Sequence, residues 1–220
     1  FLTSVIGVPW QDIARKNGAG KPDLLGGLDA NKRAVGGFQS PSELVANGVW
    51  ATILGDPTTY VTNPGTLPKD PLMVESIDPR QGKHPITGDP VAPPKSAYDA
   101  NTINGHEFSI PARNDLQYAC VFELPDNRDC SDPKQVACDC IDGNNDNPLC
   151  QNPVNNTFSQ IQRRAKAYPG IRHLSIAKLL GEQAIVGSIC PAQLKDTTRL
   201  DFGYRPVVRT LVQAVASVLK

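Results

Sequence analysis

The segment EQAIVGSICP, residues Glu182–Pro191, decides the fold because it joins a short apolar run to a cysteine and a proline. Residues Gln183–Ile189 form a β-rich run, and a run of this length predicts a strand. A second run of the same kind, FLTSVIGV, occupies Phe1–Val8 and leads into Pro9. Continuous apolar runs are typical of parallel strands that are buried on both faces, so we expect both segments to lie inside a sheet.

Helical patterns lie between and after these runs. The tetrapeptide Ser40-Pro41-Ser42-Glu43 is a helix-start signal, with Ser40 as N-cap, proline at the first helical position and Glu43 completing a capping box. This helix should end at Gly55-Asp56-Pro57, and its inward side chains should be Leu44, Val45, Val49, Ile53 and Leu54. Further helices are predicted over Ser159–Ala167, His173–Leu180 and Tyr204–Leu219.

The order of these elements predicts the fold class. The two ends of the chain contain strand–helix and helix–strand–helix, an alternation that indicates an α/β fold with a partly parallel sheet flanked by helices. We expect residues 1–220 to form one such domain, as the C-terminal part of a longer chain, since Phe1 already lies in a predicted strand. Residues 57–156 should be a long, loop-rich insertion with short strands at Leu72–Ile77 and Ala119–Leu124.

Five of the six cysteines lie in this insertion, and three kinds of site could explain them. A structural zinc site needs pairs spaced Cys-x2–4-Cys, whereas the closest pair here, Cys138-x-Cys140, has a single intervening residue. A redox centre needs Cys-x-x-Cys, which the sequence lacks. Disulfides remain. They suit an even number of cysteines in a segment with few apolar side chains, because crosslinks offset the chain entropy that is lost on ordering.

We therefore predict that all six cysteines form disulfides. Six cysteines allow 15 pairings, and the spacing does not choose among them, although Cys190 should tie the insertion to the core because it follows a predicted strand. Disulfides predict an extracellular, cell-surface or periplasmic location. The six residues are Cys120, Cys130, Cys138, Cys140, Cys150 and Cys190.

Oxygen-bearing side chains alternate between the cysteines, at Asp139, Asp142, Asn144 and Asp146. Such an alternation is able to wrap a calcium ion, the one cofactor that the sequence suggests. The loop lacks the glycine and the glutamate that an EF-hand has at its sixth and twelfth positions. The alternative is a set of turns that favour aspartate and asparagine for conformational reasons.

Motifs of known enzyme classes are missing: the sequence has no Gly-x-Ser-x-Gly, no His-Glu-x-x-His and no Walker loop. The best candidate for catalysis is the loop Asn104-Gly105-His106-Glu107 together with Asp115, where a histidine beside a carboxylate could act as a general base. The alternative is a hydrogen-bonded structural histidine.

The charge of the chain excludes one class of partner. Lysine plus arginine and aspartate plus glutamate both number 22, so the formal net charge is zero. Nucleic-acid binding requires a basic surface, and we expect none. No apolar run reaches the length of a membrane span. The expected partners are a protein or surface ligand, neighbouring subunits, or a preceding part of the same chain.

Two parts of the chain resemble a known family. The segments HLSIAKLL (His173–Leu180), EQAIVGSICP and DFGYRPVVRTLVQAVASVLK (Asp201–Lys220) are similar to the last helix–strand–helix of von Willebrand factor A-like domains in secreted bacterial proteins. FLTSVIGVPWQDIA (Phe1–Ala14) resembles the mid-sheet strand of the same group. The resemblance implies a doubly wound α/β fold and, in adhesive members, a metal-dependent ligand site. The Asp-x-Ser-x-Ser signature of that site is absent here, so no metal residue is carried over.

The leading hypothesis is therefore a secreted or surface-exposed, non-enzymatic binding domain of adhesion type. It depends on the contrast between regular ends and a long crosslinked insertion, because long ordered loops tend to be functional. Two alternatives stay open. One is a secreted hydrolase that uses His106, Glu107 and Asp115, and the other is a structural subunit of an extracellular assembly.

Overall fold

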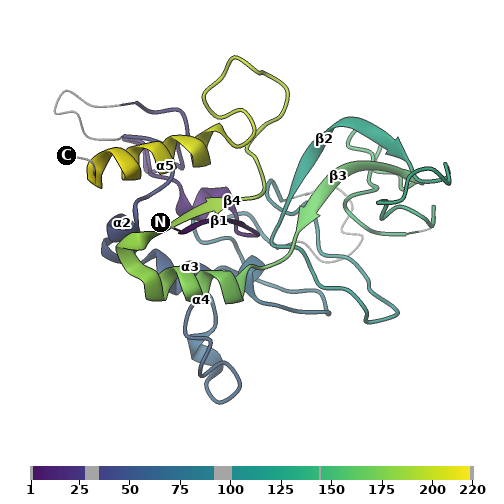
Figure 1. Cartoon of the computed structure of the whole chain (residues 1–220). Helices are drawn as coiled ribbons and strands as arrows, with labels where there is room; N and C mark the ends of the chain where they lie inside the picture. The colour runs from purple at the N-terminus through teal and green to yellow at the C-terminus, as the bar shows by residue number, and fades with distance from the viewer. Residues whose placement is uncertain (1, 28–34, 92–100, 144, 219–220) are drawn as a thin grey trace.

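A small parallel sheet forms the centre of the first lobe of the protein (Figure 1). The computed structural model describes residues 2–27, 35–91, 101–143 and 145–218. Strand β1 (Leu2–Ile6) pairs in parallel with β4 (Ala184–Ser188), in a register that places Leu2 opposite Ala184 and Ile6 opposite Ser188. All five residues of β4 are buried, as expected. The same expectation is wrong for β1, which leaves Leu2 and Val5 each 39% exposed.

Helices cover both faces of this sheet, which confirms the predicted α/β class. Figure 1 shows α5 (Arg205–Val218) on one side and α4 (Ile171–Leu180) on the other. Gly187 allows α5 to pack closely, since a Cβ atom there would lie 2.7 Å from a methyl group of Val207. The short helix α1 (Trp10–Ile13) follows β1 directly and contacts β4.

The predicted capping box at Ser40 is present, but the helix that it starts is divided. Helix α2 (Pro41–Ala46) ends at Asn47, and α3 (Val49–Ile53) begins after Gly48, whose φ of 64° interrupts the helical backbone. The break turns Val45 away from the core, leaving it 67% exposed, so its predicted inward position is wrong. The predicted end before Asp56 is confirmed.

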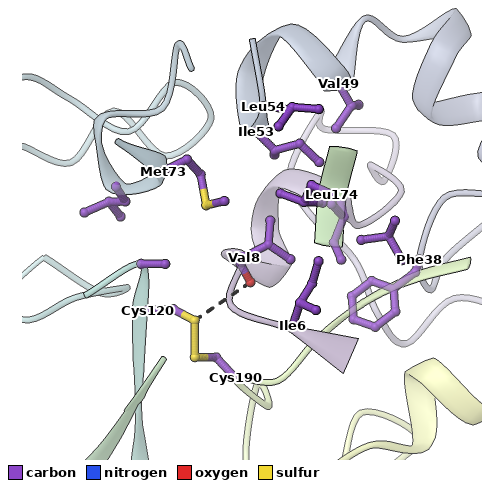
Figure 2. Close-up of a cluster of buried hydrophobic side chains, with 14 of the residues drawn as sticks. Ile6, Val8, Phe38, Val49, Ile53, Leu54, Met73, Cys120, Leu174 and Cys190 are labelled. Carbon is purple, nitrogen blue, oxygen red and sulfur yellow. Dashed lines mark hydrogen bonds between the residues drawn. A yellow bond between two sulfur atoms is a disulfide. The ribbon is translucent and has the colours of Figure 1, made fainter. Parts of the chain in front are cut away.

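The main hydrophobic core joins the parallel sheet to α2–α4 and to the insertion (Figure 2). Ile6 and Val8 lie at its centre, with Leu174 of α4 close by and Met73 reaching in from the insertion. Cys120 and Cys190 close one side of the cluster, and the Cys120 sulfur contacts the Val8 carbonyl at 3.8 Å. The insertion therefore shares the core of the α/β part.

An antiparallel ribbon forms the second lobe, on the right of Figure 1. Strand β2 (Cys120–Asp129) confirms the strand that was predicted over Ala119–Leu124, and it pairs with β3 (Ile161–Ala167). The helix predicted over Ser159–Ala167 is wrong, because cross-strand pairing with β2 overrides the helix preference of its arginine, lysine and alanine residues. The register slips between Glu123 and Arg128, around Pro125, which has no N–H to donate to the ladder.

The strand predicted over Leu72–Ile77 is also wrong. Asp70 caps a short 3-10 helix, η2 (Pro71–Met73), by accepting a hydrogen bond from the Leu72 amide at 2.9 Å. The carbonyls of Leu72 and Val74 accept hydrogen bonds from the guanidinium of Arg80 and pair with none of the described strands. Two further 3-10 helices, η1 (Pro64–Thr66) and η3 (Gly181–Gln183), are equally short.

All six cysteines form disulfides, as predicted. The pairs are Cys120–Cys190, Cys130–Cys138 and Cys140–Cys150. The first joins residues 70 apart in sequence and ties β2 to the segment after β4, which confirms the expected role of Cys190. The other two close loops of 8 and 10 residues within the insertion.

Candidate functional site

A cleft of about 460 Å³ lies where the two lobes meet. Helix α1 supplies Trp10 and Gln11, the start of β2 supplies Phe122, and the Cys120–Cys190 disulfide also lines it. Trp10 and Phe122 are half-buried against the main core. The cleft exists because the disulfide holds β2 beside the segment that follows β4, while the loop of residues 101–105 forms another part of the wall.

Two carboxamides that line this cleft contain buried atoms without a hydrogen-bond partner among the described residues. They are Oε1 of Gln11 and Nδ2 of Asn101, in residues that are 8% and 5% exposed. Each buried polar atom left in this state costs about 1–3 kcal/mol of stability. Native proteins contain few of them, so a pair at one cleft calls for an explanation.

The charged side chains of the cleft are already engaged within the protein. Glu123 and Lys195 form an ion pair with each other. The guanidinium of Arg164 donates to the Pro148 carbonyl at 2.7 Å. The remaining surface is aromatic, aliphatic and amide, which suits an uncharged ligand.

No protein family, curated protein or solved structure matches this chain. Its function therefore has to be inferred from the chemistry of its own residues. Among the described residues, no helix is long and apolar enough to span a membrane.

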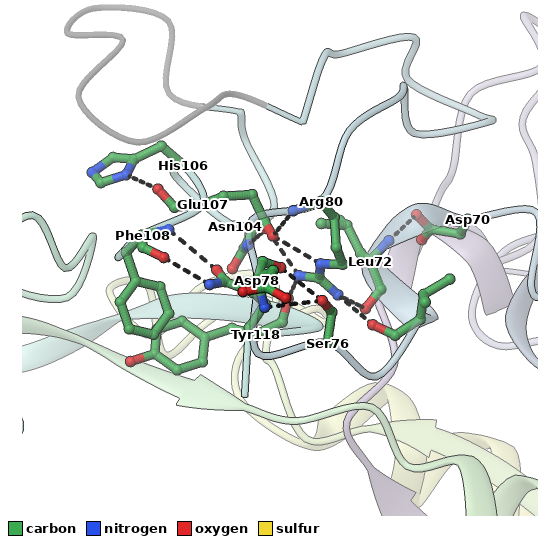
Figure 3. A network of polar contacts seen from close by, with 12 residues as sticks. Asp70, Leu72, Ser76, Asp78, Arg80, Asn104, His106, Glu107, Phe108 and Tyr118 are labelled. Carbon is green, nitrogen blue, oxygen red and sulfur yellow. Dashed lines mark hydrogen bonds and ion pairs between the residues drawn. The ribbon is translucent and has the colours of Figure 1, made fainter. Parts of the chain in front are cut away.

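The structure places Glu107 at the centre of a buried polar network (Figure 3). Its two carboxylate oxygens accept from the Arg80 guanidinium at 2.9 Å each, from the Arg80 amide at 2.8 Å, and from Asn104 at 2.8 Å. Arg80 also donates to the carbonyls of Leu72, Val74 and Tyr118. A carboxylate with this many donors has no free lone pair directed at a substrate, so its geometry is that of a structural anchor.

The other two candidate catalytic residues face different partners. His106 is 2% exposed; its Nδ1 lies 2.6 Å from the Glu107 carbonyl, and its Nε2 is buried without a partner among the described residues. Burial lowers the pKa of His106, which keeps the ring neutral. Asp115 binds Tyr168 at 2.5 Å and Lys166 at 3.2 Å. The three residues therefore serve separate contacts.

The candidate calcium ligands also point to separate partners. Asp139 pairs with Lys166 at 2.8 Å, whereas both oxygens of Asp146 accept from the Ser109 amide at 3.1 Å. Asn144 lies outside the described residues. The Asp142 carbonyl accepts from the Asn145 amide group. Calcium binding at this loop stays a prediction.

A buried cluster that the sequence did not reveal lies behind the cleft wall. Asp12 of α1, Asp70 before η2 and His84 of the insertion bring their ligand-type atoms within 4.8 Å of one another. The side chains of all three are fully buried. Nε2 of His84 is 2.9 Å from Oδ1 of Asp12, at an angle too oblique for a hydrogen bond, and 3.5 Å from Oδ2 of Asp70.

The imidazole orientation argues against a metal ion in this cluster. Nδ1 of His84 accepts hydrogen bonds from the amides of Thr87 at 3.1 Å and Ile86 at 3.3 Å. A metal on Nε2 would require the ring proton to sit on Nδ1, where metal-bound histidines normally donate to an acceptor. Here two N–H groups already point at Nδ1, so the neutral ring carries its proton on Nε2, toward Asp12.

The two carboxyl groups are coupled to each other. Burial raises the pKa of Asp12 to about 6, although the neighbouring Asp70 carboxyl group and the charge of Lys16 act in the opposite direction. Burial and the negative charge of Asp12 raise the pKa of Asp70 well above its usual value. Burial lowers the pKa of His84, while Asp70 and Asp89 partly counteract it. The cluster consequently combines a ring that resists protonation with two carboxyl groups that release their protons at higher pH than exposed carboxyl groups do.

Proposed function

We propose that this chain is an extracellular, non-enzymatic binding domain whose cleft takes a neutral saccharide. The extracellular assignment is supported by the three disulfides, which persist in oxidising compartments. The non-enzymatic assignment is supported by the engaged state of Glu107 and Asp115, which bind Arg80 and Tyr168, and by the pairing of Glu123 with Lys195 in the cleft wall.

The lining of the cleft carries the proposed ligand class: Gln11 and Asn101 are carboxamides with hydrogen-bonding atoms, Oε1 and Nδ2, that no described residue uses. These atoms are buried and reach a ligand only when the side chains turn toward the cleft. A sugar hydroxyl both donates and accepts, so it would then suit both groups. The half-buried rings of Trp10 and Phe122 offer apolar surface for the C–H face of the ring. Glu123 and Lys195 balance each other's charge, and the Arg164 guanidinium donates to protein carbonyls, which favours an uncharged ligand.

The test uses tryptophan fluorescence, because Trp10 lines the cleft while the second tryptophan, Trp50, is buried in the core. In a Trp50→Phe background, neutral di- and trisaccharides are titrated into the full chain at millimolar concentrations. We expect a saturable change in Trp10 emission, with the saccharide recovered chemically unchanged. A flat response to every saccharide in the panel contradicts the proposed ligand.

Substitution of Gln11 provides the decisive comparison. We expect Gln11→Ala to weaken binding at least about tenfold, because the ligand loses a hydrogen-bonding carboxamide of the cleft wall. The same change should not lower stability by more than about 1 kcal/mol, since the replaced amide has an unpartnered oxygen. Gln135→Ala, at an exposed position outside the cleft, serves as the matched control. Equal affinity in both variants would remove Gln11 from the site.

A further inference from the structure

The Asp12–Asp70–His84 cluster contains buried carboxylate oxygens that lack a donor in the described part of the chain. Both oxygens of Asp12 and Oδ2 of Asp70 are buried and receive no hydrogen bond from a donor among the described residues. Two ionised carboxylates cannot remain this close in a dry site, because each loses its hydration and repels the other. A proton between them supplies the missing donor and removes one charge.

The three side chains come from segments that are distant in sequence, so their protonation controls how these segments pack. Asp12 belongs to α1, whose neighbouring residues Trp10 and Gln11 line the cleft. Asp70 caps η2 through Oδ1, and His84 caps the turn that follows it through Nδ1. These two caps hold Asp70 and His84 within residues 70–91. Asp12 lacks such a cap among the described residues, so it is the group that is able to move away from the other two.

We propose that Asp12, Asp70 and His84 form a proton-binding switch, in which loss of the shared proton separates α1 from residues 70–91 and thereby moves one wall of the cleft. The effect of the switch on the cleft rests on the proposed function, whereas its effect on folding does not. The switch and the saccharide site can therefore fail independently, because the folding measurement needs no saccharide.

The sign of the pH effect follows from the direction of each shift. The folded-state pKa of Asp70 is raised, so the folded chain holds a proton that the unfolded chain has released above about pH 4. This contribution to stability is complete at acid pH and is lost as the pH rises through the folded-state pKa. Asp12 behaves in the same way, up to about pH 6.

Two buried histidines act in the opposite direction below pH 6.5. The pKa values of His84 and His106 are both lowered, so the unfolded chain binds protons there that the folded chain does not. Of the other charged groups that face the cluster, Lys16 acts on Asp12 and Asp89 acts on His84. The carboxyl and histidine effects oppose each other below pH 6.5. Above that pH the histidine effect fades, so a remaining slope comes from the carboxyl pair.

Urea unfolding of the intact, disulfide-bonded chain between pH 6.5 and 8 tests the switch. For the wild type we expect the unfolding equilibrium constant to rise with pH, with about tenfold per pH unit as the upper limit that the release of one proton sets. Asp70→Asn should remove this slope, since its amide keeps the cap on Leu72 and donates to Asp12 without titrating. Asp78→Asn, at an exposed ion pair with Arg113, should retain the wild-type slope.

Other outcomes overturn the proposal. A slope in Asp70→Asn that equals the wild-type slope excludes a proton at this pair. Zn²⁺ or Mn²⁺ at micromolar concentration that stabilises the wild type at pH 8, but not Asp70→Asn, would make the cluster a metal site instead. If Asp70→Asn does not fold, infrared spectroscopy of the wild type decides, because the proposal requires the band of a protonated, buried carboxylic acid at pH 7.

Discussion

Replacement of Glu107 by alanine is expected to lower the free energy of unfolding by about 3–5 kcal/mol, a large share of the 5–15 kcal/mol typical of a domain. The guanidinium of Arg80 would remain buried without its counter-charge, since its side chain is only 5% exposed. Asn104 and the Arg80 amide would lose their acceptor as well. Urea unfolding monitored by circular dichroism measures the change.

The exposed ion pair Glu123–Lys195 provides the control for charge alone. Glu123→Ala removes a carboxylate of the same kind from a side chain that is 56% exposed, and we expect a loss below about 1 kcal/mol. A double variant, Arg80→Met with Glu107→Met, should recover part of the loss, because it removes both buried charges. If Glu107→Ala is no more harmful than Glu123→Ala, the buried network does not stabilise the fold.

Loss of the Cys120–Cys190 disulfide is expected to produce the second large effect. The two cysteines are 70 residues apart, and the chain-entropy relation gives about 4 kcal/mol for a loop of this size. Both are 2% exposed and close one side of the core, so the Cys120→Ala/Cys190→Ala variant also leaves a packing defect. Unfolding in urea without reductant measures the loss, and saccharide binding in the cleft should be lost with it.

The matched control is the Cys130→Ala/Cys138→Ala variant. This disulfide closes a loop of 8 residues, for which the same relation gives about 2.5 kcal/mol, and it lies outside the cleft. We expect the control to retain Trp10 fluorescence and ligand response. A loss of stability equal to that of the Cys120/Cys190 variant would show that the long link has no special role in joining the lobes.

Local signals in the sequence were sufficient for the elements of the first lobe. β4 follows from an apolar run with no competing pattern, and the start of α2 follows from a capping box whose contacts all lie within three residues. The division after α2 was not predictable from apolar spacing, because Gly48 adopts a left-handed conformation that the pattern does not encode. β3 was missed since its residues favour helix, and its partner strand lies more than 30 residues earlier.

The site was less predictable, for a physical reason. Asp12, Asp70 and His84 meet only after the chain has folded, and each alone resembles an ordinary turn or cap residue. One signal was present, namely an aspartate shortly after the predicted buried strand Phe1–Val8, between Gln11 and Ile13. Glu107 was chosen for its neighbour His106, whereas its actual partner Arg80 lies 27 residues away. Spacing along the chain shows candidate chemistry but not which groups face each other.

The sulfur pairing also sets an order of maturation. Cys130–Cys138 and Cys140–Cys150 join near neighbours, so both can oxidise as soon as their segment has left the ribosome or a translocation channel. Cys120 precedes all four of these thiols, yet its partner arrives last, 70 residues later. During that interval the first thiol is exposed to four wrong partners. Efficient production of the native chain should accordingly depend on a disulfide isomerase, or on the two short loops closing before Cys120 reacts.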